Sequence, residues 1–288
     1  MAANLINLLL LITLGFIWGS SFILIKRGLV VFDPMQVAAI RLLVTSLFLM
    51  PFIIFGYQKL PKGKFKYIVL SGVVGSALPA FFFPLAQTQI ESSLAGILNS
   101  MTPIFTLLIG LFFFNLALNK TNVGGIIFGF AGAALLILTR GETSLQGDVL
   151  FALFALMGAI CYGLNTNLLK TYLSNVPPTL IASGSFAFLG FPAAGYLATT
   201  DFLHVVDHDH FWISFLAIAV IGIVGTGLAM VLFNILLQRT HPLFASSGTY
   251  LIPLVAVFWG FLDGEMIKWV HLIGIALILS GIYLTRKR

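Results

Sequence analysis

The sequence has too few charged residues for a water-soluble protein. Only 8% of its 288 residues are Asp, Glu, Lys or Arg, whereas 59% are hydrophobic and the mean hydropathy is +1.07. Because soluble domains carry about 25% charged residues, this chain could not maintain a hydrated surface. We therefore expect an all-α integral membrane protein whose apolar helices face lipid.

Other absences narrow the range of functions. The sequence contains no Walker loop, no nucleophile elbow and no HExxH motif, so neither ATP hydrolysis nor intramembrane proteolysis has support. Its single cysteine, Cys161, excludes an intrachain disulfide and is interpreted as a packing residue. No Asp or Glu lies near the middle of an apolar segment, whereas proton-coupled pumps usually need a titratable group within the membrane. We therefore do not expect a cationic-drug/proton antiporter.

Apolar segments long enough to cross a bilayer, about 20 residues each, recur along the whole chain. The first of them follows no basic region and precedes no clear cleavage site, so we interpret it as an uncleaved helix. The connections between segments are too short for a soluble domain. We predict ten transmembrane helices, at residues 4–25, 34–55, 67–87, 92–116, 122–139, 147–169, 178–198, 211–236, 242–262 and 268–285.

Basic and acidic residues are divided unequally between the two sides of this arrangement. If both termini are cytoplasmic, ten of the 15 Lys and Arg residues lie inside, four lie outside and Arg41 falls within the second helix. All nine acidic residues then lie outside. The positive-inside rule favours this orientation. We predict a multi-pass protein of a bacterial-type inner (plasma) membrane with cytoplasmic termini, and we interpret the net charge of +6 as a topology signal rather than evidence of a nucleic-acid partner.

The two halves of the sequence resemble each other. At a shift of 144 residues, the segment IWGSSFILIK beginning at Ile17 aligns with CYGLNTNLLK beginning at Cys161. At a shift of 150 residues, 72–112 aligns without gaps with 222–262, and eight of the 41 pairs are identical. Since each half contains five predicted helices, the second half must enter the membrane from the opposite side. We predict two inverted five-helix repeats, at residues 1–140 and 145–288.

Inverted repeats are typical of secondary transporters, whose substrate site lies near the bilayer midplane between the halves. Trp18 and Ser21 lie three residues apart and share a helix face. Their counterparts Tyr162 and Asn165 do the same. One aromatic and one hydrogen-bonding group from each half would suit a polar, uncharged cavity, whereas the neighbouring glycines are interpreted mainly as packing positions.

Several segments resemble a known family. WGSSF near the N-terminus, the Arg of AAIRLLVTSLF, and the segments NSMTPIFTLLIGLFF, YLIPLVAVFWGFLDGE and HLIGIALILSGIYL are similar to the EamA family of the drug/metabolite transporter superfamily. The resemblance implies a cavity surrounded by helices 1, 3, 4, 6, 8 and 9, with helices 5 and 10 at the periphery. It also implies export of amino acids or other small metabolites. Glu265 fits the acidic position after the ninth helix, whereas its repeat counterpart is Asn115.

Polar residues occupy equivalent turns of the fourth and ninth predicted helices. They either line the cavity or form hydrogen bonds between helices. Pro103 and Pro253 lie just beyond them and would free backbone carbonyls, so we interpret these prolines as hinges. The predicted cavity residues are Trp18, Ser21, Asn99, Thr102, Tyr162, Asn165, Ser246, Thr249 and Tyr250.

Arg41 is the most costly residue in the predicted membrane region, since an arginine at bilayer depth costs about 2.5–3.5 kcal/mol or more. It could bind a carboxylate or phosphate of a substrate. Alternatively, it could bind helix-end carbonyls or Asp33 in a structural role. The resemblance implies that an arginine is usual here across varied substrates, so we favour the structural interpretation.

Two further motifs are interpreted conservatively. The segment HVVDHDH, beginning at His204, contains metal-ligand residue types but no evident framework, so we predict a solvated loop and no metal site. Gly125 and Gly129 form a GxxxG pattern, which favours close helix packing or a homodimer through peripheral helices. No cofactor is expected.

Taken as a whole, the sequence predicts a non-ATP transporter, not an enzyme, that exports small neutral or zwitterionic metabolites such as amino acids. The alternatives are an importer or exchanger of another polar metabolite, and a membrane scaffold or receptor that transports nothing. Substrate identity, transport direction and energy coupling do not follow from the sequence.

Overall fold

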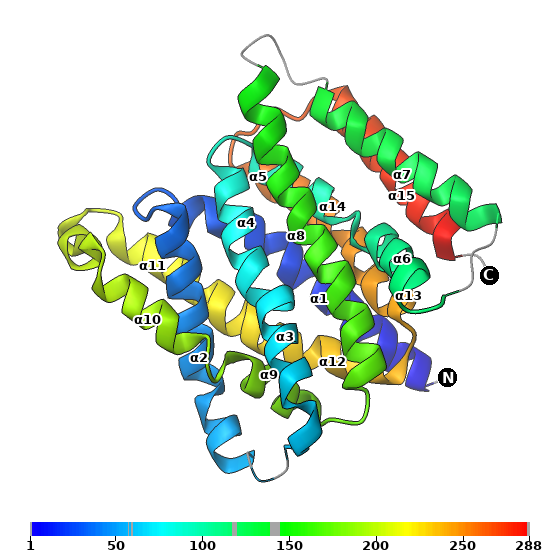
Figure 1. The fold of residues 1–288 in the computed structure, drawn as a ribbon. Helices are drawn as coiled ribbons and strands as arrows, with labels where there is room; N and C mark the ends of the chain where they lie inside the picture. Colours follow the sequence, from blue (N-terminus) through cyan, green and yellow to red (C-terminus); the bar gives the residue numbers. More distant parts are fainter. Residues whose placement is uncertain (1, 57, 59, 117–119, 139–144, 287–288) are drawn as a thin grey trace.

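The computed structural model describes residues 2–56, 58, 60–116, 120–138 and 145–286, and all regular elements within them are helices (Figure 1). Short 3-10 or π-helical segments, labelled η, interrupt several longer ones. In chain order the elements are α1 (Ala2–Gly28), α2 (Pro34–Gly56), η2 (Lys62–Lys64), α3 (Phe65–Gly72), η3 (Val73–Ala77), α4 (Leu78–Gln87), α5 (Ser92–Asn99), α6 (Thr102–Phe113), α7 (Lys120–Leu138), α8 (Leu145–Tyr172), α9 (Pro178–Phe186), α10 (Gly190–Ala198), η4 (Asp201–Asp207), α11 (Phe211–Val220), η5 (Ile221–Leu228), α12 (Ala229–Arg239), α13 (Pro242–Ser246), η6 (Ser247–Tyr250), α14 (Leu251–Leu262) and α15 (Trp269–Arg286).

Eight helical segments of the described chain are long and apolar enough to cross a membrane, so the protein is an all-helical, multi-pass membrane protein. They coincide with eight of the ten predicted spans. The other two, at 122–139 and 268–285, coincide with α7 and α15, whose apolar stretches are only Thr121–Leu136 and Trp269–Leu284. Sixteen residues span about 24 Å, less than the ~30 Å hydrocarbon core. The eight segments are Leu5–Gly28, Pro34–Gly56, Phe65–Gln87, Ser92–Phe113, Val149–Tyr172, Pro178–Ala198, Phe211–Arg239 and Pro242–Leu262.

Helices α7 and α15 pack side by side at the edge of the bundle (Figure 1). Their contact uses the glycines of the GxxxG motif, because a Cβ atom at Gly281 of α15 would lie 2.5 Å from the carbonyl oxygen of Gly125 and 2.6 Å from the backbone nitrogen of Gly129. The motif therefore holds these two helices together within the chain. The homodimer through peripheral helices stays a prediction.

The small residues of α1 and α8 allow two other helices to approach closely. A Cβ atom at Gly19 would lie 2.6 Å from Cβ of Val255 in α14. A Cβ atom at Gly163 of α8 would lie 3.0 Å from Cβ of Phe105 in α6. These glycines serve packing, as small residues commonly do between membrane helices.

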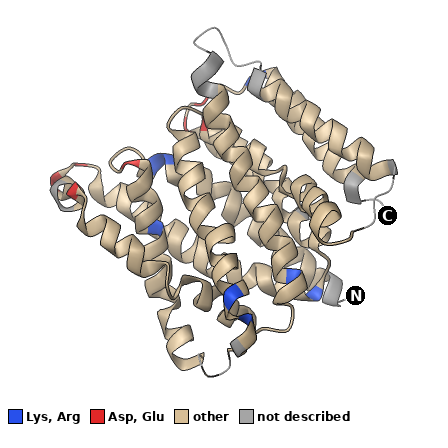
Figure 2. Ribbon diagram, in the orientation of Figure 1, with Lys and Arg blue, Asp and Glu red and all other residues tan. Residues whose placement is uncertain are grey.

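The described Asp and Glu residues gather at one end of the bundle, which is the upper part of Figure 2. Lys26 and Arg27, at the end of α1, lie at the same end and pair with Asp263 and Glu265. At the opposite end, the Lys170 ammonium donates to carbonyl oxygens at the end of α12. Acidic side chains are therefore concentrated where the predicted topology places the outside.

Candidate functional site

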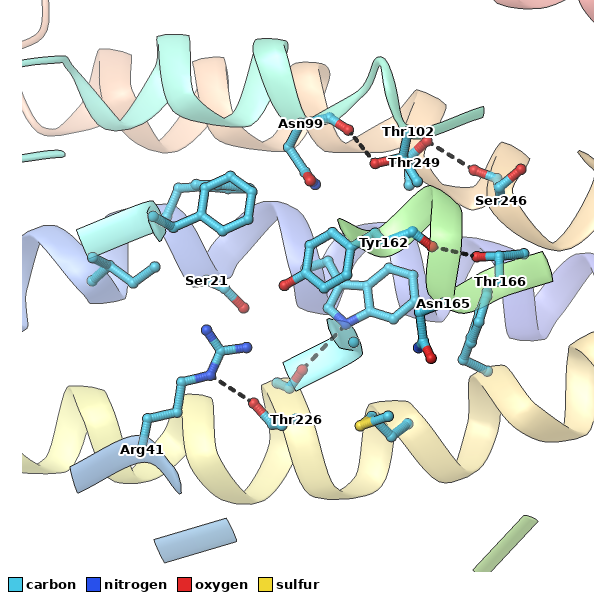
Figure 3. Close-up of a pocket in the computed structure, with 18 residues that line it drawn as sticks. Ser21, Arg41, Asn99, Thr102, Tyr162, Asn165, Thr166, Thr226, Ser246 and Thr249 are labelled. Atoms are coloured by element: carbon cyan, nitrogen blue, oxygen red, sulfur yellow. Dashed lines mark hydrogen bonds between the residues drawn. The ribbon is translucent and has the colours of Figure 1, made fainter. Parts of the chain in front are cut away.

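A cavity lies between the two halves of the chain (Figure 3). The lining comes from α1, α2, η3, α4, α5 and α6, together with α8, η5, α12, α13 and η6, whereas no described residue of α7 or α15 contributes to it. Its wall combines aromatic, hydroxyl and amide side chains with one cation. The lining residues are Trp18, Ser21, Phe22, Ile25, Arg41, Gly75, Phe83, Asn99, Thr102, Tyr162, Asn165, Thr166, Gly225, Thr226, Met230, Phe233, Ser246 and Thr249.

Helix α1 places Trp18 and Ser21 on the wall. The indole nitrogen of Trp18 donates to the carbonyl of Gly225 at 3.2 Å, and its ring packs edge-on against Phe233 with centroids 5.5 Å apart. The Ser21 hydroxyl donates to the carbonyl of Ile17 in its own helix. These contacts fix the position of the indole on the cavity wall.

Helix α8 forms the opposite wall in a similar way. Tyr162 stacks with Phe83 at a centroid distance of 5.9 Å. The amide oxygen of Asn165 accepts a 2.7 Å hydrogen bond from the Ser71 hydroxyl. Thr166, one residue farther along, donates to the carbonyl of Tyr162 at 2.8 Å. Figure 3 shows the Tyr162 ring directed into the cavity.

Two π-helical segments, η3 and η5, face these walls. Single turns of π-helix often occur at functional sites because they re-aim side chains and loosen the regular hydrogen-bond ladder. Gly75 of η3 touches the amide of Asn165, and a Cβ atom at Gly225 of η5 would lie 3.0 Å from the Ser21 hydroxyl. A larger residue at either position would displace a polar side chain of the lining.

Two spans are interrupted beside the cavity. Residues 100 and 101 separate α5 from α6, and the 3-10 segment η6 separates α13 from α14. The carbonyl of Asn99 accepts a hydrogen bond from the Thr102 hydroxyl at 2.7 Å, and that of Ser246 accepts one from Thr249 at 2.8 Å. Carbonyls released by the breaks are thus satisfied locally, as an irregular backbone at membrane depth requires. Pro103 and Pro253 lie in the first turn of α6 and of α14, directly after these breaks.

The structure places eight of the nine predicted cavity residues on the lining. Tyr250 is not among them, because it lies in the next position of the tight 3-10 segment after Thr249 and turns away. Its hydroxyl donates to the carbonyl of Ile282 in α15 at 3.2 Å. Sequence reasoning missed Phe83, Phe233, Gly75 and Gly225 as lining residues, although these four residues form two identical pairs of the repeat. The other lining residues absent from the prediction are Phe22, Ile25, Thr166, Thr226 and Met230.

Arg41 lies on the lining rather than on the helix-end carbonyls expected for a structural role. Its Nε donates to the Thr226 hydroxyl at 2.8 Å. Asp33, the alternative structural partner, instead accepts hydrogen bonds from the backbone nitrogens of Met35 and Gln36, at 2.7 and 2.9 Å. These bonds cap the first turn of α2, where a carboxylate is favoured.

At the acidic end of the bundle, Glu265 is bound at the start of α5. It accepts hydrogen bonds from the backbone nitrogen of Ser92 at 3.1 Å, from the Ser92 hydroxyl at 2.6 Å and from the backbone nitrogen of Ser93 at 3.1 Å. Burial opposes ionisation, yet bonds from Ser92, Ser93 and Lys26 outweigh it and lower the pKa of Glu265 to about 2. The carboxylate therefore joins α1, α5 and the end of α14.

The loop containing HVVDHDH includes η4 and is largely exposed. The side chain of His204 is outside the described residues. Among the side chains that are described, no group of three or more His, Cys, Asp or Glu residues could hold a metal ion.

Comparisons with known proteins agree with this architecture. The chain is 24% identical over 280 residues to the "Uncharacterized inner membrane transporter YedA" of Escherichia coli (strain K12), covering 95% of this chain and 88% of the relative. It is 24% identical over 279 residues to a "Probable amino-acid metabolite efflux pump" of Salmonella typhimurium, covering 93% and 90%. A solved chain described as "Crystal structure of protein" shares the fold with a TM-score of 0.66 at 19% identity, covering 99% and 96%.

The family model matches each half of the chain separately. The model of the EamA-like transporter family matches residues 5–138 and again residues 149–287. Nearly every described element, and all residues of the cavity lining, fall within these two matches. This chain therefore belongs to the EamA-like transporter family.

Proposed function

We propose that this membrane transporter exports small neutral or zwitterionic metabolites, such as amino acids, by alternating access. The observation that carries the proposal is the cavity between the halves, whose hydroxyl, amide and aromatic groups suit a small polar solute. A relative of similar length is named as a probable amino-acid metabolite efflux pump, which supports both the substrate class and the direction.

The contacts around the cavity support two inverted five-helix repeats. Trp18 packs on Phe233, and Tyr162 packs on Phe83. Under the shifts of 144 and 150 residues, these two pairs are counterparts. The segments η3 and η5, both π-helical, also overlap under the 150-residue shift. Equivalent contacts on both sides let the two halves exchange conformations, which is the basis of alternating access in inverted-repeat transporters.

We infer ten spans with both termini in the cytoplasm. Helices α7 and α15 complete the two repeats, and local thinning of the bilayer accommodates their short apolar stretches. The inferred orientation puts the acidic end of the bundle outside, in accordance with the positive-inside rule.

This orientation gives the acidic end a role in the transport cycle. Lys26 and Arg27 of α1 bind Asp263 and Glu265, and Glu265 also binds the start of α5. We propose that these bonds keep the outer end of the cavity closed. Release of substrate to that side then requires these bonds to break. At the inner end, the bonds from Lys170 to the Leu237 and Thr240 carbonyls join α8 to the end of α12.

Export can be tested in cells that are fed dipeptides, which are hydrolysed to amino acids inside. Cells that produce this protein should release at least one neutral amino acid faster than cells that produce the Asn99→Leu, Thr249→Leu double variant at equal membrane levels. Equal release for every amino acid would refute export of this class. Faster uptake from the medium, without faster release, would favour the importer alternative.

A further inference from the structure

Arg41 is a buried cation that is not paired with an acid. Its side chain is on the cavity wall and the residue is only 8% exposed. The ion pairs between described residues join Lys26 to Asp263 and Glu265, and Arg27 to Asp263, and none includes Arg41. A buried charge is strongly unfavourable unless it is paired and hydrogen-bonded. Among the described residues, the guanidinium has no carboxylate partner that would offset this cost.

The guanidinium is oriented toward the cavity. Its Nε donates to the Thr226 hydroxyl, which fixes the plane of the group. Figure 3 shows its two terminal nitrogens directed away from α2, toward Ser21 and the Tyr162 hydroxyl. A guanidinium with its Nε occupied still presents two N–H donors in a planar fork, which matches the two oxygens of a carboxylate.

Arg41 is the one charged residue on the described lining. A single positive charge balances one carboxylate. A phosphate dianion would leave excess negative charge in a cavity that offers no second cation, and a simple cation would be repelled.

A complementary polar group lies across the cavity. Asn99 of α5 is 4% exposed, and its amide oxygen is buried without a hydrogen-bond partner. Figure 3 shows its side chain extending from α5 into the cavity, opposite Arg41. An unsatisfied buried acceptor is costly, and an N–H group of a ligand would satisfy it.

We propose that Arg41 binds the carboxylate of the transported molecule while the Asn99 amide oxygen accepts a hydrogen bond from its amino group. The inference rests on the proposed function and specifies its substrate as a molecule with both groups, such as a neutral α-amino acid. It replaces the structural role that the sequence favours for Arg41. It also orients the substrate, with its carboxylate at Arg41 and its amino group at Asn99.

The test uses binding to purified protein in detergent, so it does not depend on transport. The probes are the neutral L-amino acids, their C-terminal amides and their N-acetyl derivatives, measured by thermal stabilisation and calorimetry. The wild type should bind at least one amino acid about 10- to 100-fold more tightly than its amide, the size expected for charge-assisted hydrogen bonds. Arg41→Gln should abolish this ratio, and Arg41→Lys should retain part of it as a point charge.

Thr45 offers a matched packing control. It lies one turn from Arg41 in α2 and is fully buried, and its hydroxyl lies within hydrogen-bonding distance of the backbone carbonyls of Arg41 and Gly222, at 2.7 and 2.8 Å, yet it is not on the lining. Thr45→Val should lower the melting temperature but keep the preference for acid over amide. Asn99→Leu should reduce the preference for the free amino acid over its N-acetyl derivative.

The proposal is overturned if the wild type binds acid and amide equally, if no amino acid in the panel binds, or if Arg41→Gln keeps the acid-over-amide ratio. Should Arg41→Gln fail to fold, the wild-type ratio and the Arg41→Lys ratio still decide the question. Acid-selective binding without any transport in liposomes would refute the proposed function and leave the carboxylate site standing. Transport of solutes that lack a carboxylate would refute the carboxylate site and leave the proposed transport function standing.

Discussion

The ammonium group of Lys26 lies 2.9 Å from Oε1 of Glu265, which joins the last turn of the first helix to the loop after α14. The same ammonium lies 2.6 Å from Oδ2 of Asp263. The Glu265 side chain is only 3% exposed, whereas that of Lys26 is 38% exposed. A carboxylate this well buried is stable only because the donors of α5 and Lys26 replace its water.

Glu265→Gln should destabilise the protein. The amide keeps the shape of the side chain but cannot balance the charge of Lys26, and its NH₂ group would face the backbone donors of Ser92 and Ser93. The loss should be on the order of 1.5–3 kcal/mol, as for other buried charge-assisted hydrogen bonds. Melting curves in detergent measure it. Lys268→Gln is the control, since it removes an exposed charge from the same loop, and a comparable loss in both variants would contradict the assigned role.

The contribution of Glu265 should depend on pH in a defined direction. Its pKa falls from an ordinary 4.5 to about 2 in the folded protein. The folded state therefore favours the carboxylate, and the resulting stability is fully present above about pH 4.5 and is lost as the pH falls toward 2. The difference in melting temperature between wild type and Glu265→Gln should be largest near pH 6 and should shrink by pH 3. A difference that stays constant or widens on acidification would be inconsistent with this pKa.

Replacement of Asn99 or Thr249 by Leu should reduce transport at least about tenfold, because each change removes a polar group from a buried site that must hydrogen-bond its substrate. The folded yield of Asn99→Leu should hardly change, since leucine is well tolerated in membrane helices. Thr249→Leu also removes the donor to the Ser246 carbonyl, so it should lower the melting temperature as well. Transport in liposomes and gel filtration in detergent measure the two effects. Thr13→Leu, at an exposed position of α1, serves as the control. Wild-type transport with both cavity residues replaced would assign these positions to packing.

The proposed orientation predicts that a reporter fused to the C-terminus is active only in the cytoplasm. The nine acidic residues should then lie on the outer side of the membrane, together with the exposed loop between α10 and α11. Paired fusions with alkaline phosphatase and green fluorescent protein report the two compartments. Phosphatase activity of the C-terminal fusion would indicate the opposite orientation, with the Lys26–Glu265 cluster in the cytoplasm.

The sequence predicts much of this site because the repeat marks equivalent positions. Trp18, Tyr162, Asn99 and Thr249 are recognisable as polar or aromatic residues at matching places in apolar helices, and all four lie on the cavity wall. Helix periodicity then indicates which face of its helix each residue occupies. Tyr250 follows Thr249 directly, so its side chain leaves the backbone roughly 100–120° around the helix axis from that of Thr249, and its hydroxyl donates to the carbonyl of Ile282 instead.

Other features depend on contacts that no local pattern records. Arg41 bonds to Thr226 rather than to Asp33 because α2 packs on η5. Arg41 and Thr226 are 185 positions apart in the sequence, so no local pattern could pair them. The GxxxG motif of α7 indicates close packing, but only the fold identifies α15 as its partner.

Counterflow in proteoliposomes tests the central claim most directly. Liposomes that contain the purified protein are loaded with unlabelled neutral amino acids and diluted into a trace of each labelled one. The account predicts transient accumulation of at least one label above that in protein-free liposomes, and its loss in the Asn99→Leu, Thr249→Leu double variant. Folded wild-type protein that accumulates none of the labels, or a double variant that accumulates them at the wild-type rate, would contradict it.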